Sequence, residues 1–347
     1  MNAIAQAQKF NLANAIDIGK ATDQAATQNI FSDYLSRKAK NTITRHLKEL
    51  RNFGRFLDSL GIHNKGMMEL IEWKPVTWGL IEGYKKYMLK SGYSVNTINQ
   101  TIYIIKAYAT MAGMAEIISP DKLIYIKAVK GYKSKEIPHI DERRKESAIS
   151  TRIGRKKAEA TRISADDARR LKLQPDTPRG RRDALLMTIL LDHGLRISEV
   201  IGLKKNNFNM QDRTFTFYRP KTNRTDTHRM TDDTFNAAKK YFDMIQDVIQ
   251  FDENDSIWTS IKKNNAQYEI RKGLAKVSAQ KRVTTLGKEI GIDKFSCHDC
   301  RHYFATAAHK AGTDTLDIMA AGGWATPAMV ARYVNKDAIS NLNVKLG

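Results

Sequence analysis

The chain has 347 residues, 41% of them hydrophobic, and it exceeds the length of roughly 250–300 residues at which one core usually stops growing, so two domains are expected. Its 58 lysines and arginines outnumber its 37 acidic residues, and the net charge of +21 predicts a polyanionic partner such as nucleic acid. Neither a membrane span nor a secretory signal is visible, and the two cysteines exclude a disulfide framework. These features favour a cytoplasmic, nucleoid-associated protein.

The first predicted domain is a helical bundle over residues 27–130. Apolar side chains recur every three or four positions in 47–60 and again in 98–109, which is typical of amphipathic helices. Ser119 followed by Pro120 predicts the start of a third helix. Residues 1–26 show no clear apolar stripe and are predicted to be a flexible arm.

A basic linker is predicted at residues 131–160. Positions 127–157 hold 11 Lys and Arg against 4 Asp and Glu, with little periodicity. Such a stretch suits a chain that crosses a DNA backbone, although a solvated tether has the same composition. The candidate phosphate-binding residues are Lys130, Lys133, Arg143, Arg144, Lys156 and Lys157.

The second predicted domain spans residues 161–347. Ser164 with Asp167 resembles a capping box, and Thr177 followed by Pro178 begins a helix. Residues 213–219 alternate like a strand, and after a turn a short segment near position 229 returns; another extended piece is expected at 256–260. Helical patterns fill the rest. The expected fold class is therefore mainly α with a small β-sheet (α+β), in two domains.

The stretch FSCHDCRHYF, residues 295–304, contains the only cysteines, Cys297 and Cys300. Structural zinc needs four ligands, and no second pair of cysteines or histidines with ligand spacing is present, so no metal site is predicted. His298 and Arg301 lie three residues apart and would share one face of a helix capped by Ser296. Both side chains suit a phosphate oxygen.

Three further motifs give this pair a context. GLRISE at 194–199 contains Arg196 and Glu199, YRPKTNR at 218–224 contains Lys221, and Trp324 precedes Tyr333 by nine residues. In their order and spacing these residues resemble the tyrosine recombinases of the phage integrase family, and tryptophan in place of the commoner histidine resembles its Cre-like members. The resemblance covers the whole second domain, and the first domain resembles the family's core-binding domain.

The resemblance implies a site-specific recombinase whose two domains clamp DNA in a C shape. Tyr333 would be the nucleophile, forming a covalent 3′-phosphotyrosyl intermediate, and Glu199 would support Arg196. It also implies a homo-tetramer acting on two double-stranded DNA sites, with accessory DNA-bending or directionality proteins as further partners.

The residue types fit this chemistry on physical grounds. Arg196 and Arg301 can hold the charged phosphate oxygens without a metal or other cofactor. Lys221 suits a general acid for the leaving 5′-hydroxyl, and His298 a general base or hydrogen-bond donor. Trp324 would pack and donate one indole N–H.

Two alternatives remain open at this stage. A type IB topoisomerase uses a similar constellation, but the helical first domain and basic linker favour a recombinase. A catalytically inactive architectural DNA-binding protein is disfavoured by the complete set of candidate residues.

Overall fold

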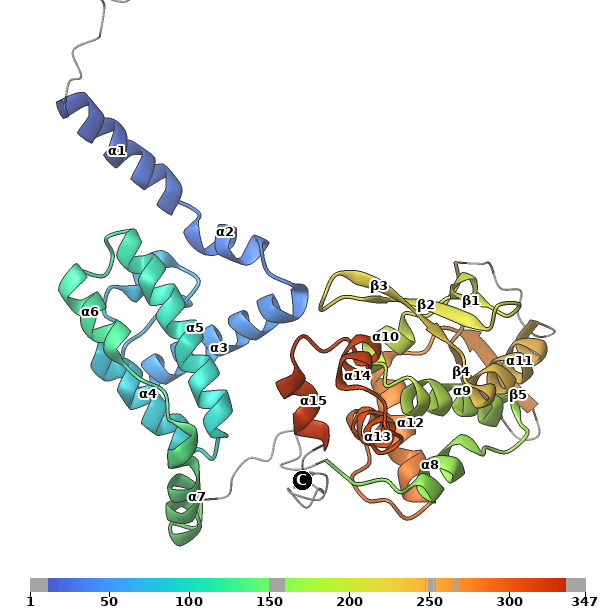
Figure 1. The fold of residues 1–347 in the computed structure, drawn as a ribbon. Helices are drawn as coiled ribbons and strands as arrows, with labels where there is room; N and C mark the ends of the chain where they lie inside the picture. The colour runs from blue at the N-terminus through green and yellow to red at the C-terminus, as the bar shows by residue number, and fades with distance from the viewer. Residues whose placement is uncertain are drawn as a thin grey trace, which may run out of the picture. The chain divides into compact units, whose positions relative to one another are not determined.

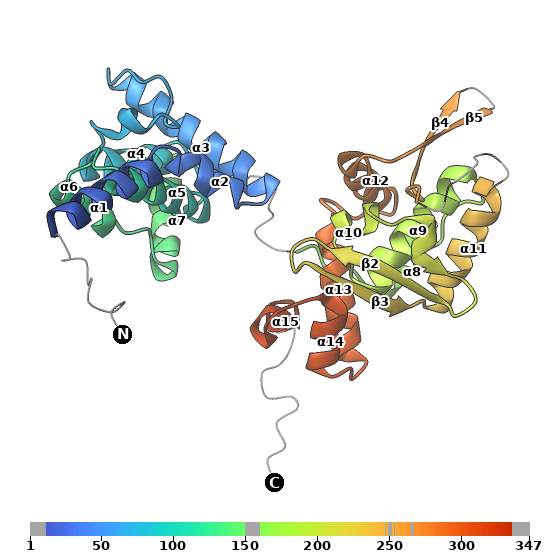
Figure 2. The same ribbon diagram turned by 90° about the horizontal axis from the view of Figure 1, so that it is seen from above.

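The computed structural model of the protein describes residues 12–149 and 160–334, apart from positions 247, 249–251, 253, 265 and 266. The chain separates into two compact units, Met1–Lys157 and Ala158–Gly347 (Figures 1 and 2). The expected mainly helical, two-domain architecture with small sheets is confirmed. Among the helices of the described residues, none is long and apolar enough to cross a membrane.

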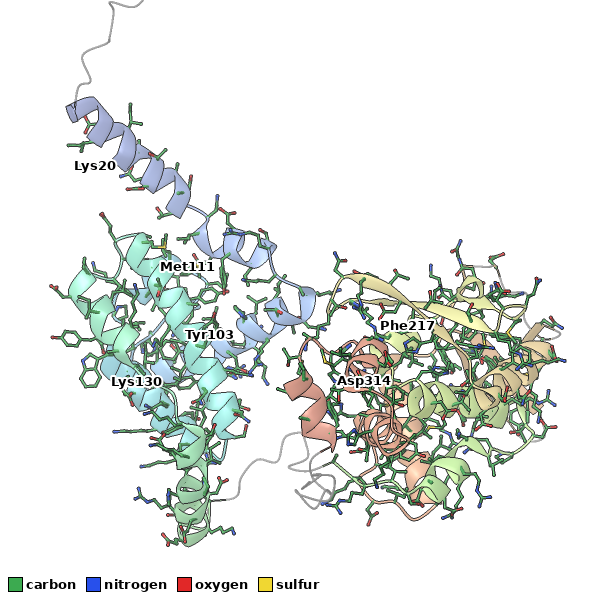
Figure 3. The ribbon with its side chains drawn as sticks, in the orientation of Figure 1. Lys20, Tyr103, Met111, Lys130, Phe217 and Asp314 are labelled. Carbon is green, nitrogen blue, oxygen red and sulfur yellow. The ribbon has the colours of Figure 1, made fainter. Side chains whose placement is uncertain are left out.

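The first unit is entirely helical in its described part. Helix α5 lies at its centre, with Ile98, Ile102 and Ile105 buried as the apolar spacing predicts, while Tyr103 projects from the opposite face (Figure 3). The elements are α1 (Leu12–Thr27), α2 (Ile30–Ser36), α3 (Lys40–Ser59), η1 (Leu70–Trp73), α4 (Trp78–Lys90), α5 (Val95–Met114), α6 (Pro120–Ala128), η2 (Ser134–Glu136) and α7 (Ile137–Glu146).

The N-terminal segment differs from its prediction. Residues 12–26, expected to be part of a flexible arm, lie in helix α1, and the side chains from Ile16 to Ala26 are all exposed. Four alanines fall within 13–25, and alanine has the highest intrinsic helix propensity. The spacing of apolar residues does not reveal such a helix, because its side chains from Ile16 to Ala26 are exposed.

The predicted linker also differs, because residues 131–149 belong to the first unit. Asn99 and Tyr132 exchange two hydrogen bonds of 2.8 Å, and Lys106 Nζ donates to the carbonyl of Val129 at 2.7 Å. Helix α5 therefore holds the chain as it leaves α6. Lys156 and Lys157 lie outside the described residues.

Arg144, predicted to contact phosphate, serves the fold of this unit instead. Its side chain is 4% exposed, and Nη2 donates to the carbonyls of Leu89 and Tyr93 at 2.9 and 2.6 Å. These carbonyls lie at and just beyond the C-terminal end of α4, where helix carbonyls lack intrahelical partners. Composition could not separate Arg144 from its exposed neighbour Arg143, because both lie in one basic run.

The neighbouring arginines give a matched test. Arg144→Met should lower the free energy of unfolding by about 1–3 kcal/mol, because two carbonyls lose a charged donor. Arg143→Met should change it by less than about 0.5 kcal/mol. Urea unfolding of the full chain measures both. Equal stability of the two variants would contradict the structural role of Arg144.

In the second unit the central helix is α9 (Pro178–Asp192), and the other elements bury it on nearly all sides. The predicted capping box of Ser164 and the capping of the next helix by Thr177 are both present. The elements are α8 (Ala165–Lys172), α9 (Pro178–Asp192), α10 (Ile197–Ile201), η3 (Lys205–Asn207), β1 (Phe208–Asn209), β2 (Thr214–Arg219), β3 (Arg224–Arg229), α11 (Asp232–Gln246), β4 (Thr259–Asn264), β5 (Gln267–Lys272), α12 (Lys276–Glu289), α13 (Cys297–Lys310), α14 (Thr315–Gly322) and α15 (Pro327–Val334).

Two antiparallel sheets belong to this unit. One has the order β1-β2-β3, with Arg219 opposite Arg224 at the β2–β3 turn, and the returning strand is longer than predicted. The other is the hairpin β4–β5, of which only the start was expected from the sequence. Its strands are mostly polar, and their one cross-strand aliphatic pair, Ile261 with Ile270, gives little alternation to detect.

Candidate active site

The C-terminal end of α14 gathers three arginine side chains. The carbonyl of Gly322 accepts from Arg301 Nη2 at 2.5 Å and from Arg219 Nη1 at 3.1 Å. The carbonyl of Gly323 accepts from Arg196 Nη2 at 3.3 Å. The last carbonyls of a helix lack intrahelical donors and form the negative end of its dipole. This helix end therefore offsets the repulsion among three neighbouring guanidinium groups.

The two glycines make this arrangement sterically feasible. Gly323 has φ +61°, and a Cβ atom there would lie 2.8 Å from Nη1 of Arg219. A Cβ atom on Gly322 would lie 1.7 Å from the Trp324 ring. The sequence marks these glycines only as a break between helices, whereas the structure requires them for close approach of Arg219 and Trp324.

Arg196 is fixed by the buried carboxylate of Glu199. Arg196 is the N-cap residue of α10, and its backbone N–H and its Nη1 each donate to Glu199 at 2.8 Å. Glu199 also accepts from Arg219 Nη1 at 3.4 Å. The Arg196 side chain is 24% exposed while that of Glu199 is 1% exposed. The carboxylate thus orients a guanidinium that still reaches the surface.

Arg301 lies deeper than Arg196 and is held by two backbone carbonyls. It is 2% exposed, its Nη1 donates to the Gly194 carbonyl at 2.6 Å, and its guanidinium carbon lies 4.0 Å from the centre of the Trp324 ring. Burial, followed by repulsion from Arg196, lowers the pKa of Arg301 to about 10. The group is therefore still charged at neutral pH.

Tyr333 lies between the face of α13 and Trp324. Its ring centroid is 5.1 Å from that of Trp324, 4.2 Å from that of His302 and 6.0 Å from that of His298. The Tyr333 carbonyl accepts from Thr306 Oγ1 at 3.0 Å. The structure thus brings five of the six predicted catalytic residues together: Arg196, His298, Arg301, Trp324 and Tyr333.

Lys221, the sixth, lies exposed on the turn between β2 and β3. Its ammonium group makes no hydrogen bond or ion pair with the part of the chain that the structure describes. Its neighbour Arg219 is fully buried and ion-paired with Asp226. From this turn the sequence analysis predicted only Lys221 as a site residue. The alternation that buries Phe215 and Phe217 on β2 continues to Arg219, so the signal for its burial was present.

The two cysteines are core residues of α13. Both are buried, and burial raises the pKa of Cys297 to about 12, so this sulfur remains a thiol at neutral pH. Within residues 12–149 and the described positions of 160–334, no three His, Cys, Asp or Glu side chains are arranged to hold a metal ion.

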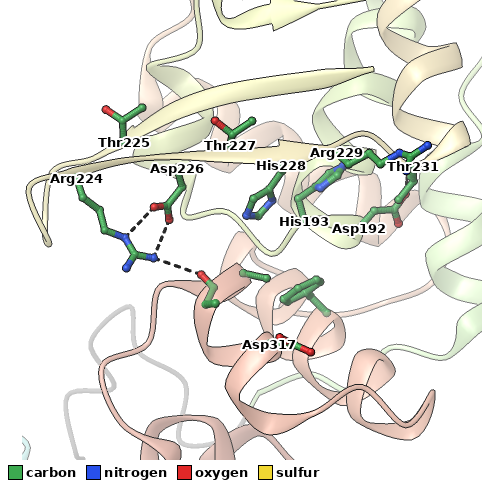
Figure 4. Close-up of a pocket in the computed structure, with 13 residues that line it drawn as sticks. Asp192, His193, Arg224, Thr225, Asp226, Thr227, His228, Arg229, Thr231 and Asp317 are labelled. Atoms are coloured by element: carbon green, nitrogen blue, oxygen red, sulfur yellow. Dashed lines mark hydrogen bonds and ion pairs between the residues drawn. The ribbon is translucent and has the colours of Figure 1, made fainter. Parts of the chain in front are cut away.

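A cavity of about 640 Å³ lies beside the site, between β3 and the helices α13 and α14 (Figure 4). Arg224 pairs with Asp226 at its rim and donates to the Ala320 carbonyl at 3.4 Å (Figure 4). His193 and His228 line its inner end, and burial lowers their pKa values to about 3 and about 4. Both imidazoles are therefore neutral in the folded protein.

Because these two histidines are neutral in the folded protein, we expect the stability of the fold to decrease in acid. Below about pH 6.5 the unfolded chain protonates them while the folded chain does not, so stability is complete above pH 6.5 and decreases toward pH 4. Each histidine contributes at most about 1.4 kcal/mol per pH unit. Urea unfolding between pH 7 and pH 5 should show a shallower decrease for His193→Asn than for the wild type. An unchanged decrease would contradict this origin, and the exposed His309 supplies the control variant His309→Asn.

Two compact units and a site that combines arginines with a tyrosine are typical of tyrosine recombinases. The family model for the phage integrase family matches residues 161–339, and the model for the phage integrase SAM-like domain matches residues 25–128. The first match alone covers more than half of the chain. The chain therefore belongs to the phage integrase family.

Individual proteins are more distantly similar. Tyrosine recombinase XerD of Neisseria meningitidis is 28% identical over 157 residues, which cover 44% of this chain and only about half, 51%, of that protein. Transposase A from transposon Tn554 of Staphylococcus aureus is 22% identical over 305 residues, covering 83% of this chain and 81% of that protein.

Two solved structures share the fold. A lambda integrase dimer bound to a COC′ core site has a TM-score of 0.61 and 12% identity, over 93% of this chain and 99% of that chain. The Tn1549 transposon integrase in complex with a circular intermediate DNA has a TM-score of 0.59 and 15% identity, over 89% and 94%.

Proposed function

We propose that the protein is a site-specific DNA recombinase that cleaves and rejoins DNA through a covalent 3′-phosphotyrosyl intermediate. The observation that carries this proposal is the position of Tyr333, packed against Trp324 while Trp324 covers the guanidinium of Arg301. Attack by the Tyr333 oxygen on phosphorus forms the tyrosyl ester and breaks the bond to the 5′ oxygen. Attack by a 5′-hydroxyl reverses the step and needs no external energy source.

The arginines would stabilise the negative charge that builds on the non-bridging oxygens. Arg301 uses Nη1 and Nη2 on protein carbonyls, so its position is set before DNA binds. Arg196 is partly exposed and can present donors to the phosphate. Removing one such preorganised donor typically costs about 10²–10³-fold in rate.

Two residues would handle protons. Lys221, at the tip of an exposed turn, would protonate the leaving 5′ oxygen, with the hairpin bringing it to the phosphate when DNA is bound. His298 is exposed beside Tyr333 and would accept the phenol proton or donate a hydrogen bond to the phosphate.

The DNA surface would include the basic segment that precedes the second unit. Lys130, Lys133 and Arg143 are exposed and would contact phosphates, and Lys156 and Lys157 are proposed for the same role. A homo-tetramer on two DNA sites, acting with DNA-bending or directionality proteins in the nucleoid, would complete the reaction. The proposal is supported by the charge of +21 and by the DNA complexes of structurally similar proteins.

A nicked duplex tests the activity directly. Cleavage close to a nick releases a short strand, so the covalent complex cannot be reversed and accumulates. Duplexes made from the DNA that flanks the gene should yield an adduct that resists detergent, also in excess EDTA. Relaxation of supercoils without joining of two sites would favour a topoisomerase. DNA binding without any adduct would favour an inactive architectural protein.

A further inference from the structure

One face of α13 meets the segment that carries Tyr333. His298, His302 and Thr306 follow one another at four-residue spacing, which places them on the same side of the helix. The first two have their rings near the Tyr333 ring, and Thr306 donates its hydroxyl to the Tyr333 carbonyl. Arg301 leaves the same helix one residue before His302. The helix thus links the phosphate-binding arginine to the tyrosine.

His302 makes the closest ring contact with Tyr333. Their centroids lie 4.2 Å apart, against 5.1 Å for Trp324 and 6.0 Å for His298. His302 also meets His298 edge to face at 4.8 Å, so the three rings form one cluster. The His302 and Tyr333 ring planes are tilted by 56° to one another, and aromatic rings in such close contact restrict each other's orientation.

We propose that His302 is a positioning residue for the reaction, which places the phenol of Tyr333 for attack on phosphorus. This inference rests on the proposed function of Tyr333. The helix that carries the nucleophile, α15, has only eight residues, so its own backbone restrains the ring weakly. Thr306 fixes the Tyr333 backbone, while His302 and Trp324 restrain the ring. Displacing a reacting atom by about 1 Å can cost about 10²-fold in rate.

Removing the ring tests this role. His302→Ala should slow single-turnover cleavage of nicked DNA by about 10–100-fold while the dissociation constant for DNA stays within about twofold. His302→Phe restores a ring without a titratable nitrogen and should recover most of the lost rate. His309→Ala, the same change at an exposed position of α13, should cleave like the wild type. Thermal unfolding of each variant shows whether a slow variant is still folded.

A double variant tests the shared action of the two contacts. Thr306→Val removes the hydroxyl that binds the Tyr333 carbonyl. The double variant with His302→Ala should slow cleavage by less than the product of the factors measured for the two single variants. Cleavage by His302→Ala at the wild-type rate would overturn the proposal, as would recovery by His302→Gln but not by His302→Phe. Persistence of an adduct in Tyr333→Phe would instead refute the assignment of the nucleophile, so the two failures are distinguishable.

Discussion

Tyr333→Phe is expected to bind DNA like the wild type and to form no covalent complex. The substitution removes one oxygen and keeps the ring, so the contacts with His302 and Trp324 survive. Loss of a covalent nucleophile costs at least about 10⁴-fold in rate in well-studied enzymes. Incubation with nicked DNA, followed by denaturing electrophoresis, measures the adduct, and a filter or mobility assay measures binding.

The control for this variant is another tyrosine of the same unit. Tyr303 lies on α13, is partly buried and packs against the core around α9. Tyr303→Phe loses the same atom and should form the adduct at nearly the wild-type rate. If Tyr333→Phe still became linked to DNA, the nucleophile would lie elsewhere and the role given to Trp324 would fall with it.

The sequence predicted those parts of the fold in which a local signal and the final structure agree. Ser164 and Thr177 start helices because a side-chain oxygen next to a helix start satisfies free N–H groups wherever the helix later packs. The buried stripe of α5 follows from its 3.6-residue period. The site could be anticipated because the resemblance supplied residues from distant segments as one set.

Other features depend on tertiary contacts that no local pattern encodes. The sequence gives no reason to distinguish Arg144 from Arg143. Only the packing of α7 against the end of α4 gives Arg144 a structural role. His302 was not singled out from the sequence, since its proximity to Tyr333 depends on how α15 packs on α13. The burial of Arg219 could have been predicted, because it continues the alternation of buried residues on β2. It was not predicted, because an arginine is rarely found in a protein core.

The second large effect is expected at Arg301, where charge and geometry can be separated. Arg301→Lys keeps a positive charge but has one nitrogen in place of a planar fork. Arg301 now reaches the carbonyls of Gly194 and Gly322 with two different nitrogens. An ammonium has three donors, but its single nitrogen cannot occupy the positions of both Nη1 and Nη2, so the contacts with the two carbonyls and a phosphate would be displaced or lost. Cleavage should therefore fall by about 10²–10³-fold, with DNA affinity within a few-fold of the wild type.

The same substitution should also lower the free energy of unfolding by about 1–3 kcal/mol, because buried carbonyls lose a charged donor. Arg224→Lys is the matched control, since Arg224 also meets a carbonyl of α14 but is exposed and paired with Asp226. It should cleave within about threefold of the wild type and unfold with nearly unchanged free energy. Single-turnover cleavage and urea unfolding of both variants decide the matter. If Arg301→Lys lost stability but cleaved like the wild type, Arg301 would be a scaffold residue, and the charge that stabilises the transition state would have to come from Arg196 and the exposed lysines alone.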